Sequence, residues 1–225
     1  MDTGRVADLM REAEAAFRAG DMEGSLALLS HATRISPDNA AIWENHGMTL
    51  LRLGRAEEAV VSYDRATGIA PQESSGWRGR SGALAALGRL SEAIDSAERA
   101  VAVGPGDAAS RNDLGCLLAK TRRVADALES FSRATDLAPD SSVAWRNRGS
   151  ALEALGRLDE ALASYDKAVG LGARVGSGSS PGTGSPRCGE VSVFYWAEGS
   201  ARKIHCRWSR QSLPTARSSA CRLKR

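Results

Sequence analysis

The segment WENHGMTLLRLGRAEEAVVSYDRATGIAP, residues 43–71, predicts two helices joined by a tight turn. Between Trp43 and Leu53 apolar residues recur at helical spacing, and Gly54 then supplies the turn because glycine takes positive φ without steric cost. A second amphipathic run follows, and Pro71 ends it because proline cannot continue the helical hydrogen-bond ladder. The segment therefore predicts a helical hairpin.

This hairpin recurs along the chain at an interval of 34 residues. Four series of identical residues keep that interval: Pro37, Pro71, Pro105 and Pro139; Ala32, Ala66, Ala100, Ala134 and Ala168; Gly20, Gly54, Gly88 and Gly156; Leu50, Leu84, Leu118 and Leu152. A fixed period of this length is typical of repeat architectures. No single hairpin buries its apolar face alone, so five hairpins are expected to stack side by side.

Small residues stand where the two helices of a hairpin must approach closely. In the first helices these are Ala13, Gly47, Ser81, Gly115 and Gly149, which are expected to face Ser25, Ala59, Ala93, Ala127 and Ala161 in the second helices. A larger side chain there would push the hairpin apart. The wider gaps are expected to be filled by aromatic core residues: Trp43, Trp77, Trp145, Tyr63, Phe131 and Tyr165.

The pattern Trp-x2-x-Gly-x2-Leu, then Ala-x3-Tyr or Phe, Ala and Pro, resembles the tetratricopeptide repeat over residues 6–172. The chain departs from the family pattern at His46, Arg80 and Arg148, at Arg111 in place of tryptophan, at Arg122 in place of the turn glycine, and at Ala173 in place of the closing proline. The resemblance implies an all-α fold, a right-handed α-α superhelix of five helix-turn-helix repeats. The repeats are expected near 6–39, 40–73, 74–107, 108–141 and 142–173.

In the family that the chain resembles, the first helix of each repeat lines a concave groove. The residues one and five positions after the tryptophan point into this groove. The peptide-binding groove is therefore expected to be lined by Glu44, Met48, Arg78, Asn112, Cys116, Arg146 and Ser150. Gly82 shares this register, and Arg18, Arg52 and Lys120 are expected at the groove edge. Such a polar surface suits an extended peptide, so we expect a non-catalytic protein–protein interaction scaffold with a protein or peptide ligand. An acidic ligand is one candidate.

Two narrower functions follow from family resemblance. The clamp by which some tetratricopeptide domains hold acidic chaperone tails is not expected, because Glu44, Gly79 and Asp113 occupy places that require amides or cations. Residues 144–169 are similar to repeats that precede the catalytic domain of O-linked N-acetylglucosamine transferases. The alternative function is therefore a substrate-recruiting arm of a truncated multidomain enzyme.

Residues 174–225 differ chemically from residues 1–173. The first 173 residues carry 20 basic and 25 acidic side chains, whereas the tail carries 10 and 2. The tail begins with a Gly/Ser/Pro-rich stretch and is expected to be disordered or nonnative. Nucleic acid is expected as a partner only through the cations of this tail. A zinc or redox element using Cys188, His205, Cys206 and Cys221 is disfavoured by their spacing. Val191 to Trp196 forms at most one strand, without an evident partner strand.

The remaining residues do not predict catalysis. The three histidines are His31, His46 and His205, each expected to be hydrogen-bonded or solvated, and no phosphate-binding loop or hydrolase motif occurs. We therefore expect no enzyme activity, no cofactor and no metal. The charged N-terminus and the lack of a long apolar run favour a cytoplasmic protein without a membrane partner. Because no capping helix follows Leu162, Tyr165 and Val169, self-association through the last repeat is a further expectation.

Overall fold

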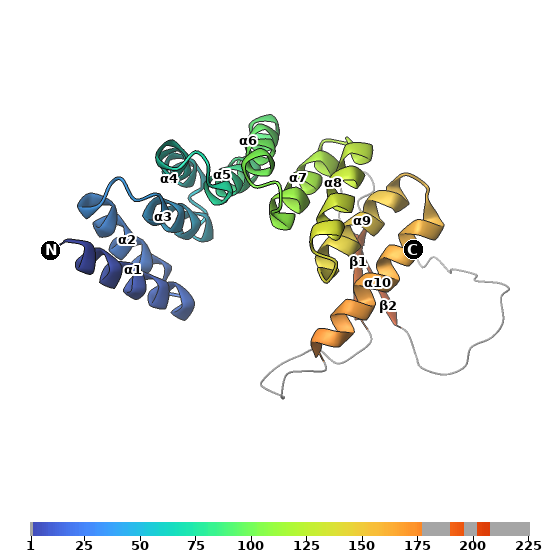
Figure 1. Ribbon diagram of the computed structural model, residues 1–225. Coiled ribbons are helices and arrows are strands. Elements are labelled where there is room, and N and C mark those ends of the chain that lie inside the picture. Colours follow the sequence, from blue (N-terminus) through green and yellow to red (C-terminus); the bar gives the residue numbers. More distant parts are fainter. Residues whose placement is uncertain (1, 177–189, 196–201, 208–225) are drawn as a thin grey trace. The chain divides into compact units, whose positions relative to one another are not determined.

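The computed structural model describes residues 2–176, 190–195 and 202–207, with side-chain detail for residues 4–172. Residues 2–176 form ten helices that pair in sequence (Figure 1). Their bounds are α1 Asp2–Ala19, α2 Met22–Ile35, α3 Ala40–Arg52, α4 Ala56–Ile69, α5 Ser74–Ala86, α6 Leu90–Val103, α7 Ala108–Lys120, α8 Val124–Leu137, α9 Ser142–Ala154 and α10 Leu158–Gly176. The expected all-α array of five hairpins is confirmed.

The turn inside each hairpin uses a left-handed residue. Glycine takes positive φ at four of the five turns, at Gly20, Gly54, Gly88 and Gly156. In the fourth repeat Arg122 takes the same conformation, with φ of 63°. A side chain at positive φ is strained because its Cβ crowds the following carbonyl. The fold therefore imposes the turn geometry on a residue that does not favour it.

In the second, third and fifth repeats a tryptophan holds the loop that enters the repeat. The indole Nε1 atoms of Trp43, Trp77 and Trp145 donate to the carbonyl oxygens of the prolines six residues earlier, at 2.8, 2.9 and 2.9 Å. Arg111 donates through Nε to the Pro105 carbonyl at 3.4 Å. The arginine thus replaces the missing indole with the same bond, at greater length. The tryptophans are half-buried and clamp this loop, whereas the buried aromatic residues are Tyr63 and Phe131.

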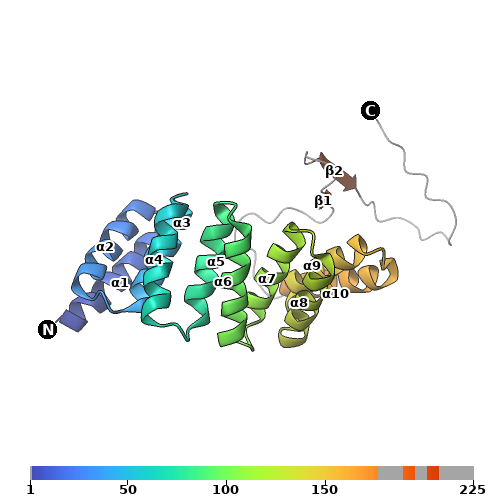
Figure 2. The same ribbon diagram turned by 90° about the horizontal axis from the view of Figure 1, so that it is seen from above.

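The packing of the hairpins produces curvature. Every helix packs against the next one in sequence, and α3, α5, α7 and α9 also contact one another in succession. Within residues 2–176 no contact of similar extent joins successive second helices. The first helices are therefore closer together and form the inner wall of the arc, with α4 and α6 on its outer side (Figure 1). Figure 2 shows successive hairpins standing side by side.

The small residues lie where close approach requires them. A Cβ at Gly47, Gly115 or Gly149 would lie within about 3 Å of the ring in the same repeat, of Tyr63, Phe131 and Tyr165 respectively. Ser81 is buried and its Oγ donates to the Ala93 carbonyl at 2.8 Å, which fixes α5 on α6. The expected contact with the small residue of the second helix is thus confirmed for Ser81 and Ala93, whereas the three glycines lie against aromatic rings.

A polar ladder connects neighbouring repeats at the place before the small residue. The two ring nitrogens of His46 contact Ser30 Oγ at 3.1 Å and Ser62 Oγ at 2.9 Å. Arg80 donates to Asp64 and Ser96, both at 2.6 Å, and Arg148 donates to Ser132 and Ser164 at 3.3 and 2.7 Å. The departures from the family pattern at these three positions are therefore structural links between second helices.

The chain divides into two compact units, Met1–Gly178 and Ser179–Arg225. In the second unit β1, Glu190–Tyr195, pairs antiparallel with β2, Arg202–Arg207, and Val193 lies opposite Ile204. The expectation that this strand lacks a partner was wrong. The pairing is between segments separated in sequence, which local composition does not reveal. Cys188 and Cys221 lie outside the described residues.

Candidate functional site

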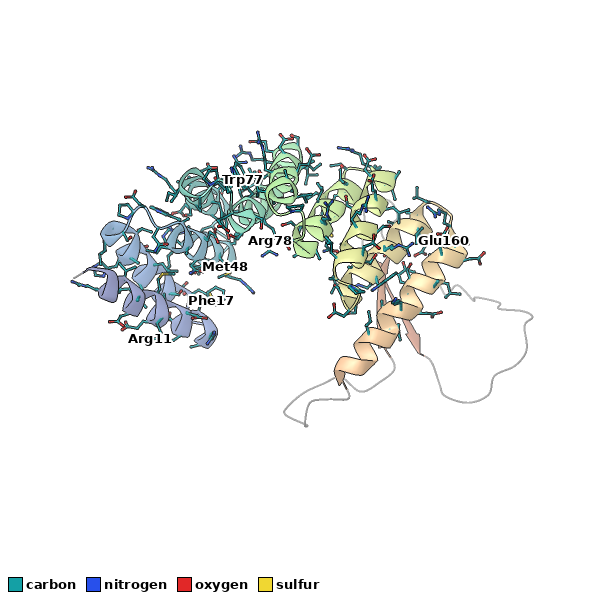
Figure 3. All side chains as sticks on the ribbon, in the orientation of Figure 1. Arg11, Phe17, Met48, Trp77, Arg78 and Glu160 are labelled. Carbon is teal, nitrogen blue, oxygen red and sulfur yellow. The ribbon has the colours of Figure 1, made fainter. Side chains whose placement is uncertain are left out.

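The seven residues predicted to line the groove all lie on first helices. Glu44 and Met48 are on α3, Arg78 on α5, Asn112 and Cys116 on α7, and Arg146 and Ser150 on α9. All are half-buried or exposed, and Met48 is 41% exposed. Figure 3 shows the Met48 and Arg78 side chains on the inner side of the arc. The structure therefore places these residues on one wall, whereas their role in binding remains a prediction.

Hydrogen bonds between repeats organise this wall. Asn147 Nδ2 donates to Asn112 Oδ1 at 2.8 Å and approaches Cys116 Sγ at 3.7 Å. Ser75 Oγ donates to Glu44 Oε1 at 2.8 Å. These bonds link α3 with α5 and α7 with α9, and they preorganise the polar groups that a ligand would contact. Asn147 itself was not among the predicted residues.

At the far end of the wall Ser150 is partly engaged. Its hydroxyl lies 3.1 Å from the Tyr165 hydroxyl, which donates to Glu153 Oε2 at 2.8 Å. Tyr165 is half-buried against Gly149. The ring therefore belongs to the hairpin packing, and Ser150 is held by its own repeat.

Among residues 4–172, ion pairs leave out the cations of the wall and also several cations of second helices, such as Arg99 and Arg133. On second helices the N-terminal arginines pair with an acid three residues later, as in Arg55 with Glu58 and Arg157 with Glu160. Arg18, expected at the groove edge, pairs with Glu14. Among the ion pairs of residues 4–172, none involves Arg52, Arg78, Lys120 or Arg146. Their charge is therefore available to an anionic group on the concave side.

The thiol in the central part of the wall is not activated as a nucleophile. Partial burial raises the pKa of the Cys116 thiol, and the neighbouring Asp113 carboxylate raises it further. Desolvation also raises the pKa of Asp113 itself. A thiol with a raised pKa is a weak nucleophile because little thiolate forms near neutral pH. Cys116 is therefore a polar groove residue with no sign of nucleophilic activation.

A pocket of about 550 Å³ lies at the N-terminal end of the wall. Its lining comes from α1, α2 and α3: Met10, Arg11, Ala13, Glu14, Phe17, Arg18, Ser25, Leu29, Asn45, Met48 and Thr49. Phe17 and Met48 are close together on the inner side of the arc in Figure 3. Only Met48 and Arg18 had been assigned to the groove or its edge. The register could have found Met10 and Glu14, which are 34 residues before Glu44 and Met48.

The described side chains offer no metal cluster. Among residues 4–172 no three histidine, cysteine or acidic side chains come together as ligands. His46 is held by two serines, and burial, together with the charge of Arg55, lowers its pKa. The structure therefore accounts for His46 as a structural residue. None of the described helices is long and apolar enough to cross a membrane.

The outer face of α10 exposes an apolar stripe. Leu158, Leu162 and Val169 are 64, 62 and 66% exposed. The equivalent residues of α4 are Ala56, Val60 and Thr67, all buried beneath the next repeat. The expectation of an uncovered face is confirmed for Leu162 and Val169, whereas Tyr165 is half-buried by its own hairpin. In the described structure no further helix covers α10.

These features define an α-helical repeat protein whose stacked hairpins form a concave polar wall, an architecture suited to binding proteins and peptides. The family described as tetratricopeptide repeat matches residues 10–74, 45–108 and 112–175. Because these matches span most of the sequence, the chain belongs to the tetratricopeptide repeat family. Among curated proteins none matches the chain.

Solved structures share the fold at low sequence identity. MamA from Desulfovibrio magneticus RS-1 has a TM-score of 0.65 at 20% identity, over 75% of this chain and 96% of that one. TTC0263, a protein of Thermus thermophilus, has a TM-score of 0.62 at 24% identity, over 76 and 97%. YrrB, described as having an unusual peptide-binding site, has a TM-score of 0.59 at 20% identity, over 76 and 92%. At these identities the similarity concerns the fold alone.

Proposed function

We propose that the chain is a non-catalytic scaffold that binds an acidic peptide segment of a partner protein along the concave wall. The observation that carries this proposal is the set of cations on that wall, Arg52, Arg78, Lys120 and Arg146, which lack ion pairs among the described residues. Cations that form no ion pair of their own favour a ligand that supplies carboxylates.

The proposed contact surface is the predicted set on α3, α5, α7 and α9. Arg78 and Arg146 supply charge, whereas Glu44, Asn112 and Ser150 supply hydrogen-bonding groups for a peptide backbone. Met48 adds an apolar surface, and Cys116 adds a thiol. A peptide-binding site in the structurally similar YrrB is consistent with this use of the fold.

A charge-reversal pair tests the proposal. Peptides selected from a displayed random library by the full-length chain are expected to be acidic, and Arg78→Glu with Arg146→Glu should weaken their binding at least about tenfold. The matched control is Arg99→Glu with Arg133→Glu, which makes the same charge change at exposed positions of α6 and α8. Equal loss in both double variants would indicate long-range charge without a groove. Unchanged binding in the Arg78 and Arg146 variant would refute the proposed site.

A further inference from the structure

The pocket between α1, α2 and α3 lies where the second, fourth and fifth repeats place an aromatic ring, whereas the third repeat has Ala97. In the second repeat the Tyr63 ring packs between Gly47 and Gly79, since a Cβ on either would lie within 3 Å of the ring. The equivalent residues of the first repeat, 34 positions earlier, are Leu29, Ala13 and Asn45. These three residues all line the pocket. Leucine replaces the tyrosine here and Ala13 replaces the glycine, and the pocket lies open beside these two smaller side chains.

The packing of the first helices agrees with this vacancy. The pairs α3 and α5, α5 and α7, and α7 and α9 make direct contacts, but α1 and α3 make no contact of that extent. The apolar core is divided at the same place, because one cluster is built on Leu29 and Ile42 and another on Leu50 and Tyr63. The pocket therefore opens between α1 and α3, while α2 still packs against α3 and Leu29 shares a cluster with Ile42 of α3.

A hydroxyl without a partner lies in the pocket wall. Ser25 is 1% exposed, and its Oγ is the only buried side-chain polar atom within residues 4–172 without a hydrogen bond. The corresponding position in every other repeat is alanine: Ala59, Ala93, Ala127 and Ala161. A buried hydroxyl that lacks a partner is costly relative to alanine. A ligand that reaches Ser25 with a polar atom would remove that cost.

The rest of the lining indicates the kind of ligand group. Met10, Phe17, Leu29 and Met48 supply apolar walls, and methionine adapts readily to an aromatic face. The guanidinium of Arg52 lies 5.7 Å from the Phe17 ring centroid and has no ion pair among the described residues. The pocket thus offers an apolar body, the buried Ser25 hydroxyl in its wall, further polar groups from Glu14 and Asn45, and the Arg52 cation beside it.

We propose that this pocket binds a tyrosine side chain of an acidic peptide ligand, with the ring among the two methionines and Phe17 and the phenol hydroxyl on Ser25. Tyrosine combines a large apolar ring with one polar tip, which matches the lining. The inference rests on the proposed peptide-binding function and specifies its anchor. The ligand supplies the ring that the first repeat lacks.

The test uses the full-length chain and three fluorescein-labelled acidic peptides that differ only at a central tyrosine, phenylalanine or alanine. The tyrosine peptide should bind about 2- to 10-fold more tightly than the phenylalanine peptide, because one buried hydrogen bond is added. It should bind at least about 30-fold more tightly than the alanine peptide. Methyl resonances of Met10 and Met48 should shift only with the two aromatic peptides.

Two variants isolate the pocket. Ser25→Ala carries the residue found in the other repeats and should fold normally, bind the phenylalanine peptide unchanged and lose the preference for tyrosine. Leu29→Tyr should block the pocket with its ring, because Ala13 stands where Tyr63 has Gly47 and keeps the new ring out of the hairpin packing. It should abolish the preference for both aromatic peptides. Equal binding of all three peptides by the unaltered chain would overturn the anchor. Retention of the tyrosine preference in Ser25→Ala would overturn the hydrogen bond that defines it.

The same peptides separate failure of the anchor from failure of the groove. The three peptides could bind the unaltered chain equally well and bind the Arg78→Glu, Arg146→Glu variant more weakly. That result would support the groove and refute the tyrosine anchor. If no peptide binds, the acidic-peptide groove is refuted, and N-acetyl-tyrosinamide then tests the pocket directly. Shifts of the Met10 and Met48 methyl resonances that saturate with this compound, and that are absent in Leu29→Tyr, would support the pocket. Absence of such shifts would overturn it.

Discussion

Gly79→Ala offers a direct test of how the second and third repeats pack. An ideal Cβ at Gly79 would lie 2.1 Å from Cε1, 2.4 Å from Cζ and 2.7 Å from Cδ1 of Tyr63. Ordinary carbon–carbon contacts are about 3.5–4.0 Å, so the ring would have to move by more than about 1 Å. Gly47 lies against the same ring, where a Cβ would come within 2.9 Å of it, so space for that movement is small.

The expected magnitude follows from two opposing terms. Overpacking of a close-packed core costs typically 1–3 kcal/mol, about the upper value for a contact this short. Replacing glycine by alanine inside a helix returns about 1 kcal/mol. We therefore expect Gly79→Ala to lower the free energy of unfolding by about 2 kcal/mol. Gly82→Ala is the matched control on the same helix, because nothing lies within 4 Å of its Cβ, and it should gain up to about 1 kcal/mol.

Urea unfolding of the full-length variants, followed by helical circular dichroism, measures both changes. In a Tyr63→Ala background the obstructing ring is absent, so Gly79→Ala should become neutral or stabilising. This coupling is the specific signature of the contact. Equal stability of Gly79→Ala and Gly82→Ala in the unaltered background would refute the proposed packing constraint.

Three other perturbations address the turn, the polar ladder and the terminal face. Arg122→Gly should raise the free energy of unfolding by about 1 kcal/mol, because Arg122 is held at positive φ. An unchanged urea midpoint would show that the backbone of Arg122 is not strained. The lowered pKa of His46 means that the folded state favours the neutral ring, so its stabilising effect is complete above the ordinary value of 6.5 and declines below it. Acidification from about pH 7.5 to 5 should therefore lower the free energy of unfolding of the unaltered chain more than that of the His46→Gln variant. An equal dependence of stability on pH in the two proteins would disprove the linkage. If the last repeat mediates self-association, Leu158→Glu with Leu162→Glu should shift any dimer to monomer in light scattering, and an unchanged mass distribution would exclude that face.

The sequence by itself determined the repeat architecture, because each turn, helix end and close approach depends on residues within one 34-residue unit. Glycine at the turn, proline at the helix end and a small residue facing alanine all act locally. The groove register also followed from the family resemblance, which places Arg78 and Arg146 on first helices. The binding role of that wall is still to be tested.

Only the tertiary structure decided what the departures from the repeat pattern do. His46, Arg80 and Arg148 became links because the two hydrogen-bond partners of each come from different repeats. The pocket arose because three neighbouring helices leave a space that Leu29 does not fill, while Ser25 is buried beside it. Likewise β1 found its partner in a segment several residues away. Such features depend on which side chains meet across helices or strands, and local periodicity does not encode those distances.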